Sequence, residues 1–384
     1  MITETITRNE SRQREKKKLI TEIAVIVGLV VIFAVFLPLA LSAFRLRLLG
    51  RFLSLAIVAL GIDLIWGYTG LLSLGHGIFF ALGGYALAMY LNLQLPPGQM
   101  PEFFTLYGVT ELPFIWQPFY SLPLTILALI IVPAIVAGLL GYLIFRNRIK
   151  GVYFSILTQA ALLVFFNFFN GQQKLINGTN GLKTDTQTIF GLLVGSDAVQ
   201  VAFYLLTIVC LLAIYLLCRW LTTGRFGRLL VAIRDDEVRV RFSGYDPTWF
   251  KVLVFAISGA IAGVAGALYT VQTGIITPNS MDVAFSIEMV IWVAVGGRAT
   301  LVGAVVGTLL VRLAQTFLSE QFPEVWVFFQ GALFLIVVTV LPDGLLGGIK
   351  RLLTHFGFRK TLITYPSIEE APEVQLEREE LEHK

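Results

Sequence analysis

Charged residues are scarce in this sequence. Asp, Glu, Lys and Arg make up 14% of its 384 residues, whereas they make up about a quarter of a typical soluble domain. Hydrophobic residues account for 56% of the chain, and the mean hydropathy is +0.79. These values exclude a soluble globular protein.

Cysteine and histidine are also rare. Cys210 and Cys218 lie in one apolar run, where a disulfide or a shared metal is implausible and a packing role is expected. His355 and His383 lie near or beyond the end of the last apolar run, so no credible metal site or His-based catalytic triad can be assembled. A nucleotide-binding loop is missing too, because 181–184 lacks the adjacent Gly-Lys and the earlier glycine of such loops. We therefore expect no enzyme activity and no cofactor or metal in this chain.

Long apolar runs are what the sequence has in abundance. About 20 residues at 1.5 Å each cross a hydrocarbon core that is about 30 Å thick. We predict an all-α integral membrane protein of about ten transmembrane helices. The expected spans are Leu19–Leu41, Phe52–Trp66, Leu71–Leu93, Ser121–Phe145, Val152–Phe169, Val199–Leu221, Val252–Thr273, Ala284–Val295, Thr300–Leu318 and Trp326–Leu341.

The positions of Lys and Arg predict the orientation. Most of the 29 basic residues fall at 1–18, 146–150, 222–251 and after 349, which places both termini in the cytoplasm. The exception is Arg45, Arg47 and Arg51, whose external placement points to an error in the first two span boundaries. The expected divisions are a basic tail (1–18), a transmembrane domain (19–351) and an acidic, disordered tail (352–384).

The segment 222–251, which we call the basic loop, contains an amphipathic pattern. Apolar residues recur at helical spacing between Phe226 and Val240, and Gly244 with Pro247 would end the helix. Asp235 with Arg239, and Glu237 with Arg241, have the i,i+4 spacing of helix-stabilising ion pairs. Charge alone leaves two roles open: a connector that lies on anionic lipid, or a helix that docks on a partner protein.

Glycine-rich segments suggest a repeat. The segments 73–84 and 286–297 are weakly similar and cross the membrane in opposite directions in this topology, which favours an inverted repeat. Small residues at 258–267, together with Gly303 and Gly307, predict close helix packing within the chain or against another subunit.

Four ionisable residues fall inside the expected spans: Asp63, His76, Glu288 and Arg312. A charged side chain at a helix centre costs about 2.5 to 3.5 kcal/mol on insertion scales, so each needs a partner or a wet surface. Either carboxylate is able to accept Arg312 as a purely structural pair. His76 either packs in the core or lines a path.

Several of these segments resemble a known family. Gly224–Tyr245 with Phe250–Tyr269 is similar to the coupling loop and the following helix of branched-chain amino acid-type ABC transporter permeases, and the similarity covers most of 52–341. Within that family, 107–113, 177–182 and 341–344 are most similar to the larger permease of the urea importers. Thr179 stands where amino acid members typically have proline, which also favours urea.

The resemblance implies a bacterial inner-membrane importer. Its other parts are a homologous permease, two cytoplasmic ATPases that carry ATP and Mg, and a periplasmic substrate-binding protein. Membrane lipid is a further contact, and nucleic acid is not expected. The residues that we assign to ATPase contact are Phe226, Leu230, Arg234, Asp235, Glu237, Arg239 and Gly244.

The substrate path needs hydrogen-bonding groups rather than a strong counter-charge, because urea is small and neutral. The alternatives are branched-chain amino acids or short amides as substrates, a self-contained channel or ion-coupled transporter, and a scaffold subunit without a path. Asn167 and Asn170 are equally consistent with plain helix-end residues. The residues that we assign to the path are Ser73, His76, Asn167, Asn170 and Glu288.

Overall fold

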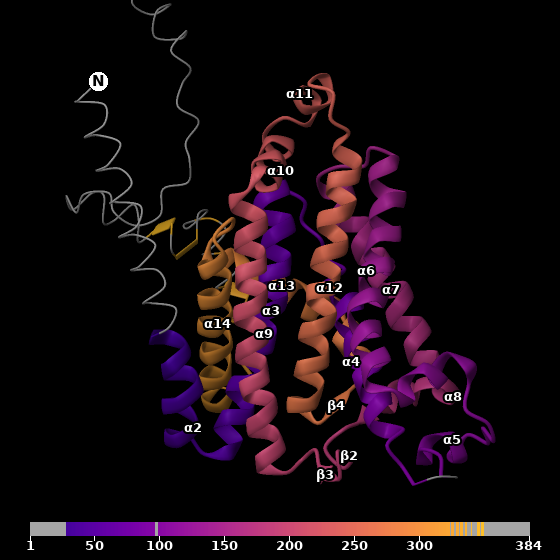
Figure 1. Ribbon diagram of the computed structural model, residues 1–384. Coiled ribbons are helices and arrows are strands. Elements are labelled where there is room, and N and C mark those ends of the chain that lie inside the picture. The colour runs from indigo at the N-terminus through magenta and orange to yellow at the C-terminus, as the bar shows by residue number, and fades with distance from the viewer. Residues whose placement is uncertain are drawn as a thin grey trace, which may run out of the picture.

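The computed structural model describes residues 28–96 and 99–322, with scattered positions between 324 and 348. The basic tail 1–18, the acidic tail 352–384 and most of the span expected at 326–341 lie outside the described residues. Figure 1 shows a bundle of long, roughly parallel helices with short helices and strands at its ends.

Helices account for most of the described chain. The first is an apolar helix from Gly28 to Ala40 that contains a π-helical turn at Ile32–Phe36 and ends as α2 (Leu37–Ala40). The others are α3 (Ala43–Thr69), α4 (His76–Asn92), α5 (Glu102–Leu106), α6 (Leu122–Arg146), α7 (Val152–Gly171), α8 (Gln173–Ile176), α9 (Asp197–Thr223), α10 (Arg225–Asp235), α11 (Glu237–Phe242), α12 (Pro247–Thr273), α13 (Val283–Gly296) and α14 (Leu301–Gln321).

Two small antiparallel ribbons close the end of the bundle opposite α10 and α11 (Figure 1). In one, β1 (Leu182–Lys183) pairs with β4 (Ile275–Ile276), and in the other β2 (Thr188–Ile189) pairs with β3 (Leu192–Leu193). The 3₁₀ segments are Phe114–Tyr120, Gly178–Asn180 and Pro278–Met281.

The helical membrane architecture is confirmed. Six described helices are long and apolar enough to cross a membrane, namely α3, α6, α7, α9, α12 and α14. The helices at Gly28–Ala40 and Val283–Gly296 are shorter. A total of about ten spans and the inverted repeat stay predictions.

The centre of the bundle is α12, which packs against α3, α4 and α6. Glycine permits this close approach, because a Cβ at Gly83 of α4 would overlap the carbonyl oxygen of Gly263, and one at Gly266 would overlap that of Phe80. Gly307 of α14 meets the backbone of α13 in the same way. In both segments of small residues, the predicted close packing therefore occurs within the chain.

The expected boundary of the second span is wrong. The helix begins at Ala43 rather than Phe52, so the three arginines lie in its first turns and not in a loop. Arg51 Nε donates to the carbonyl of Gln272 at 2.9 Å, near the carboxyl end of α12. A cation there satisfies a terminal carbonyl and complements the helix dipole.

The third span also starts later than expected. Gly70 adopts a left-handed conformation (φ 73°) and ends α3, and the chain then runs without helix until α4 begins at His76. Polar side chains of α7 bind this stretch: Ser155 Oγ donates to the carbonyl of Leu72 at 2.6 Å, and the Leu74 amide donates to Thr158 Oγ1 at 3.1 Å. Non-helical backbone at membrane depth is tolerated when protein groups satisfy it in this way.

Candidate functional site: the basic loop and the start of α4

The basic loop forms two helices rather than the single one predicted. Asp236 has extended backbone and caps α11, because its side chain accepts the amides of Val238 and Arg239 at 3.0 Å each. An Asp side chain that accepts hydrogen bonds from two backbone amides competes with the backbone hydrogen bonds of a continuous helix, so the helix ends there. The Asp235–Arg239 pair is therefore wrong: Arg239 lies 3.6 Å from Asp236, and Asp235 pairs with Arg234 at 3.1 Å.

The inner face of α10 fixes it to the bundle. Leu230 is fully buried, and the ring of Phe226 lies 6.4 Å from that of Phe250. Arg234 Nη1 donates to the Gly67 carbonyl at 2.8 Å, at the carboxyl end of α3. Phe226, Leu230 and Arg234 are assigned to ATPase contact from the sequence. All three also contact this chain, because the helix turns its apolar stripe toward the bundle, and the ATPase assignment stays a prediction.

Glu237 is also turned inward, and it binds three cations. Its carboxylate lies 3.1 Å from Lys150, 3.0 Å from Arg241 and 3.1 Å from Lys251, which confirms the predicted Arg241 pair. The side chain of Glu237 is only 9% exposed, and that of Lys251 is 1% exposed. These contacts favour a role within the chain for Glu237, and its assignment to ATPase contact stays a prediction.

The electrostatic balance at Glu237 favours its charged form. Burial alone raises the pKa of this carboxyl, but attraction by Lys251 and hydrogen bonds from Arg241, Lys150 and Lys251 outweigh burial and lower the pKa below 4.5. The four side chains, which we call the Glu237 cluster, join α11, the α6–α7 turn and the start of α12.

The outer face of the loop presents apolar and polar side chains together. Phe242 is 89% exposed and Val238 is 54% exposed at the tip of α11. Asp235 and Arg239, from the expected contact set, are exposed beside them, and Gly244 (φ 87°) terminates the tip. The sequence reasoning missed Phe242 and Val238 because it treated the segment as one helix, whose apolar stripe excludes them.

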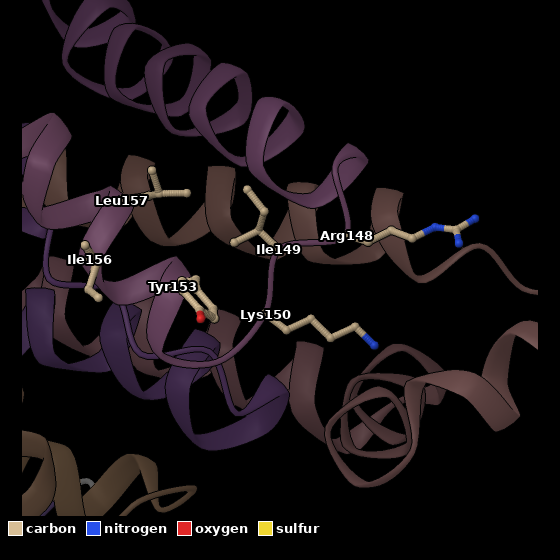
Figure 2. Close-up of a pocket in the computed structure, with 6 residues that line it drawn as sticks. All are labelled: Arg148, Ile149, Lys150, Tyr153, Ile156 and Leu157. Atoms are coloured by element: carbon tan, nitrogen blue, oxygen red, sulfur yellow. The ribbon is translucent and has the colours of Figure 1, made fainter.

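A shallow hollow of about 540 Å³ lies beside the same end of the bundle. Figure 2 shows its lining, in which Arg148 and Lys150 extend from the α6–α7 turn away from apolar Ile156 and Leu157. Basic side chains next to apolar ones suit the edge of a membrane, where long basic side chains reach anionic headgroups. The hollow is a surface feature and brings none of the expected path residues together.

His76 is buried at the amino end of α4. Its Nε2 lies 2.7 Å from Ser258 Oγ, and that hydroxyl donates its own proton to the Gly61 carbonyl at 2.6 Å. Ser258 has one proton, so His76 Nε2 is the donor of the first bond. The imidazole also meets Phe79 and Phe255 edge to face. These contacts support the packing interpretation of His76, at the point where the chain becomes helical again.

The two intramembrane carboxylates have different partners. Glu288 accepts Arg312 at 3.1 Å, with both side chains under one-fifth exposed. Asp63 does not bind Arg312. It is fully buried and accepts a hydrogen bond from the Ala299 amide at 2.7 Å. Ala299 lies in the α13–α14 turn with a positive φ of 57°, and this bond fixes its backbone there. The structural pair was predicted for either carboxylate, and the structure selects Glu288.

The remaining path residues are scattered. Ser73 Oγ accepts the Gly75 amide at 3.3 Å within the stretch between α3 and α4. Asn167 is exposed on α7 and donates to the carbonyl of Leu163 in its own helix. Asn170 is half-buried one turn later. Ser73 and His76 lie together at the start of α4, whereas the asparagines lie on the outer part of α7.

Comparison with known proteins identifies the family. The model for the permease component of branched-chain amino acid transport systems matches residues 44–338. The chain belongs to this permease family. It is thus a membrane permease component and not an enzyme.

Curated relatives agree with this assignment. The chain is 28% identical to the high-affinity branched-chain amino acid permease LivM of Salmonella typhimurium, over 76% of this chain and 67% of the relative. It is 25% identical to a probable LivM of Methanocaldococcus jannaschii, over 76% and 89%, and 24% identical to BraD of Pseudomonas aeruginosa, over 76% and 91%. No solved structure matches the chain.

Proposed function

We propose that this chain and a homologous permease form the path for urea in an ATP-driven importer of the bacterial inner membrane. Two cytoplasmic ATPases supply the work, with ATP and Mg bound on them, and a periplasmic protein delivers the substrate. The basic loop is the element that carries this proposal. Its inner face is fixed to the bundle, and its tip exposes Phe242 and Val238 among charged side chains, a pattern typical of a protein contact surface.

The charge distribution supports a cytoplasmic basic loop. The 3.1 Å contact between Lys150 and Glu237 puts the α6–α7 turn and the basic loop at one end of the bundle. Positively charged connections favour the cytoplasmic side, so this end and both termini are assigned to the cytoplasm. An ATPase docked there would meet Phe242 first, with Asp235 and Arg239 at the rim.

Urea is favoured over a zwitterion by the pairing of the deep charges. Glu288 and Arg312 bind each other, so neither offers an unpaired charge to a carboxylate or an ammonium group, and Asp63 accepts the Ala299 amide with one of its two oxygens. Urea needs only donors and acceptors of hydrogen bonds. The relatives are named as branched-chain amino acid permeases, which favours a second candidate, the branched-chain amino acids.

Uptake measurements separate the two candidates. Cells that lack their own uptake systems are given this chain with its partners, and labelled urea and labelled leucine are supplied at equal concentration. We expect accumulation of urea that needs ATP and disappears when this chain is omitted. Accumulation of leucine without urea would overturn the urea assignment and leave the importer assignment intact.

A further inference from the structure

The Glu237 cluster has a role that simple docking does not explain. We propose that Glu237 is a positioning residue that couples the basic loop to α12 and to the α6–α7 turn through its ion pairs with Lys251 and Lys150. This inference rests on the proposed function, since it takes an ATPase to dock on the tip of the loop.

The burial of the cluster favours a mechanical role over a contact role. A carboxylate that is 9% exposed and shared by three cations is not available to a partner protein. Removing charges from water is costly and is often not repaid in stability, so a buried ion pair is weak evidence for stabilisation alone. Two of its three cations, Lys150 and Lys251, belong to other elements, so the carboxylate joins three segments that are distant in sequence.

The contacts of α10 complement those of Glu237. Arg234 holds the first half of the loop to the end of α3 through the Gly67 carbonyl. Glu237 holds the second half to α12 and to the α6–α7 turn. Between these two anchors lies Asp236, where the two helices meet. A push on the tip is therefore shared between α3 on one side and α12 on the other.

Side-chain contacts continue from the cluster into the bundle. Lys251 Nζ lies 5.0 Å from the centre of the Phe145 ring. The Phe145 ring is 5.2 Å from Phe154 and 6.3 Å from Phe255, and Phe255 is 6.0 Å from His76. Close-packed interiors resist compression, so a displacement at Lys251 reaches the start of α4 through touching rings. The start of α4 is also where the chain becomes helical again after the non-helical stretch that follows α3.

The test measures transport and ATP hydrolysis in the same vesicles. The complete complex, with both permeases, both ATPases and the binding protein, is reconstituted, and the readout is substrate moved per ATP hydrolysed. The variants are Glu237→Gln, Glu237→Asp, Lys251→Met and the double variant Glu237→Gln with Lys251→Met. Glu111→Gln, an exposed carboxylate of the loop between α5 and α6, is the matched control.

Coupling and mere structural support predict different results. We expect Glu237→Gln and Lys251→Met each to lower transport per ATP about ten-fold while the ATPases remain bound, and Glu237→Asp to stay within about three-fold of the parent. The double variant removes the two buried charges and leaves only the partly exposed Lys150 and Arg241, so it avoids a buried unpaired charge if either single variant folds poorly. It must still be uncoupled. A double variant with the parental ratio, or Glu237→Gln indistinguishable from Glu111→Gln, overturns the proposal.

A second readout is independent of the substrate. Spin labels at Val152→Cys, next to the α6–α7 turn, and at Leu106→Cys, at the opposite end, report whether nucleotide moves the turn. We expect ATP with vanadate to change this distance in the parent and not in Glu237→Gln. The same change in both would refute the role of Glu237. Failure of the complex to move urea, with this distance result as expected, would count against urea alone.

Discussion

The Glu288–Arg312 pair allows a quantitative test of whether an intramembrane charge serves structure or transport. The two groups lie 3.1 Å apart, with side chains 17% and 16% exposed. The guanidinium also lies over the rings of Trp292 and Phe52, at 5.5 and 5.9 Å. Breaking a buried pair costs about 3 to 5 kcal/mol because one charge stays unpaired. Partial exposure and the remaining hydrogen bond to Gln315 favour the lower value, about 3 kcal/mol.

The assay is thermal unfolding of the purified chain in detergent. At about 2.1 cal/mol/K per residue, the unfolding entropy of 384 residues is about 0.8 kcal/mol/K, so Glu288→Gln lowers Tm by about 4 °C. Arg312→Met has a similar effect. The double variant leaves no unpaired charge and recovers to within about 1 °C of the parent. Strictly additive losses would refute the structural pair. Loss of transport in the stable double variant would instead place Glu288 in the path.

Three further predictions follow from the same structure. The pKa of Glu237 is lowered below its ordinary value of 4.5, so the charged carboxylate stabilises the folded chain at neutral pH, and this stabilisation is lost as the pH falls through the lowered pKa. The difference in Tm between the parent and Glu237→Gln should therefore narrow at that acidic pH. A difference in Tm that does not change with pH contradicts this prediction. Gly83→Ala forces α4 away from α12 and should cost about 1 to 3 kcal/mol or more, whereas Gly138→Ala, whose added Cβ meets its nearest atom at 3.7 Å, should be nearly neutral in Tm. Phe242→Ala should reduce co-purification of the ATPases about ten-fold or more without lowering Tm, because its ring is 89% exposed; equal retention by Phe242→Ala and by the control Phe114→Ala, at the other end of the bundle, contradicts the docking surface.

Composition and periodicity were sufficient for the class of fold. Runs of apolar residues predict membrane helices because their length matches the bilayer. The same rule failed at Arg45–Arg51, since an arginine that binds carbonyls at the end of α12 is compatible with a helix. It failed again at Leu71, where polar groups of α7 satisfy non-helical backbone. Both errors arise from partners that are distant in sequence.

The candidate site was predicted in its position and only partly in its contacts. The amphipathic stripe located the basic loop but not the direction of its apolar face, since Leu230 was assigned to ATPase contact and is buried against the bundle, and the i,i+4 rule found the Glu237–Arg241 pair. Neither rule identifies Lys150 and Lys251 as partners, because both lie on other elements. The helix break at Asp236 was also missed, although Asp is a common helix cap. That break is what exposes Phe242.

Reconstitution tests the central claim, that this permease component receives its work from partner ATPases. Vesicles are prepared with this chain alone and with the complete set of partners, and uptake of labelled urea and leucine is measured with and without ATP. The account predicts ATP-dependent uptake by the complete complex and none by the chain alone. Uptake by the chain alone, whether or not ATP is present, would contradict it.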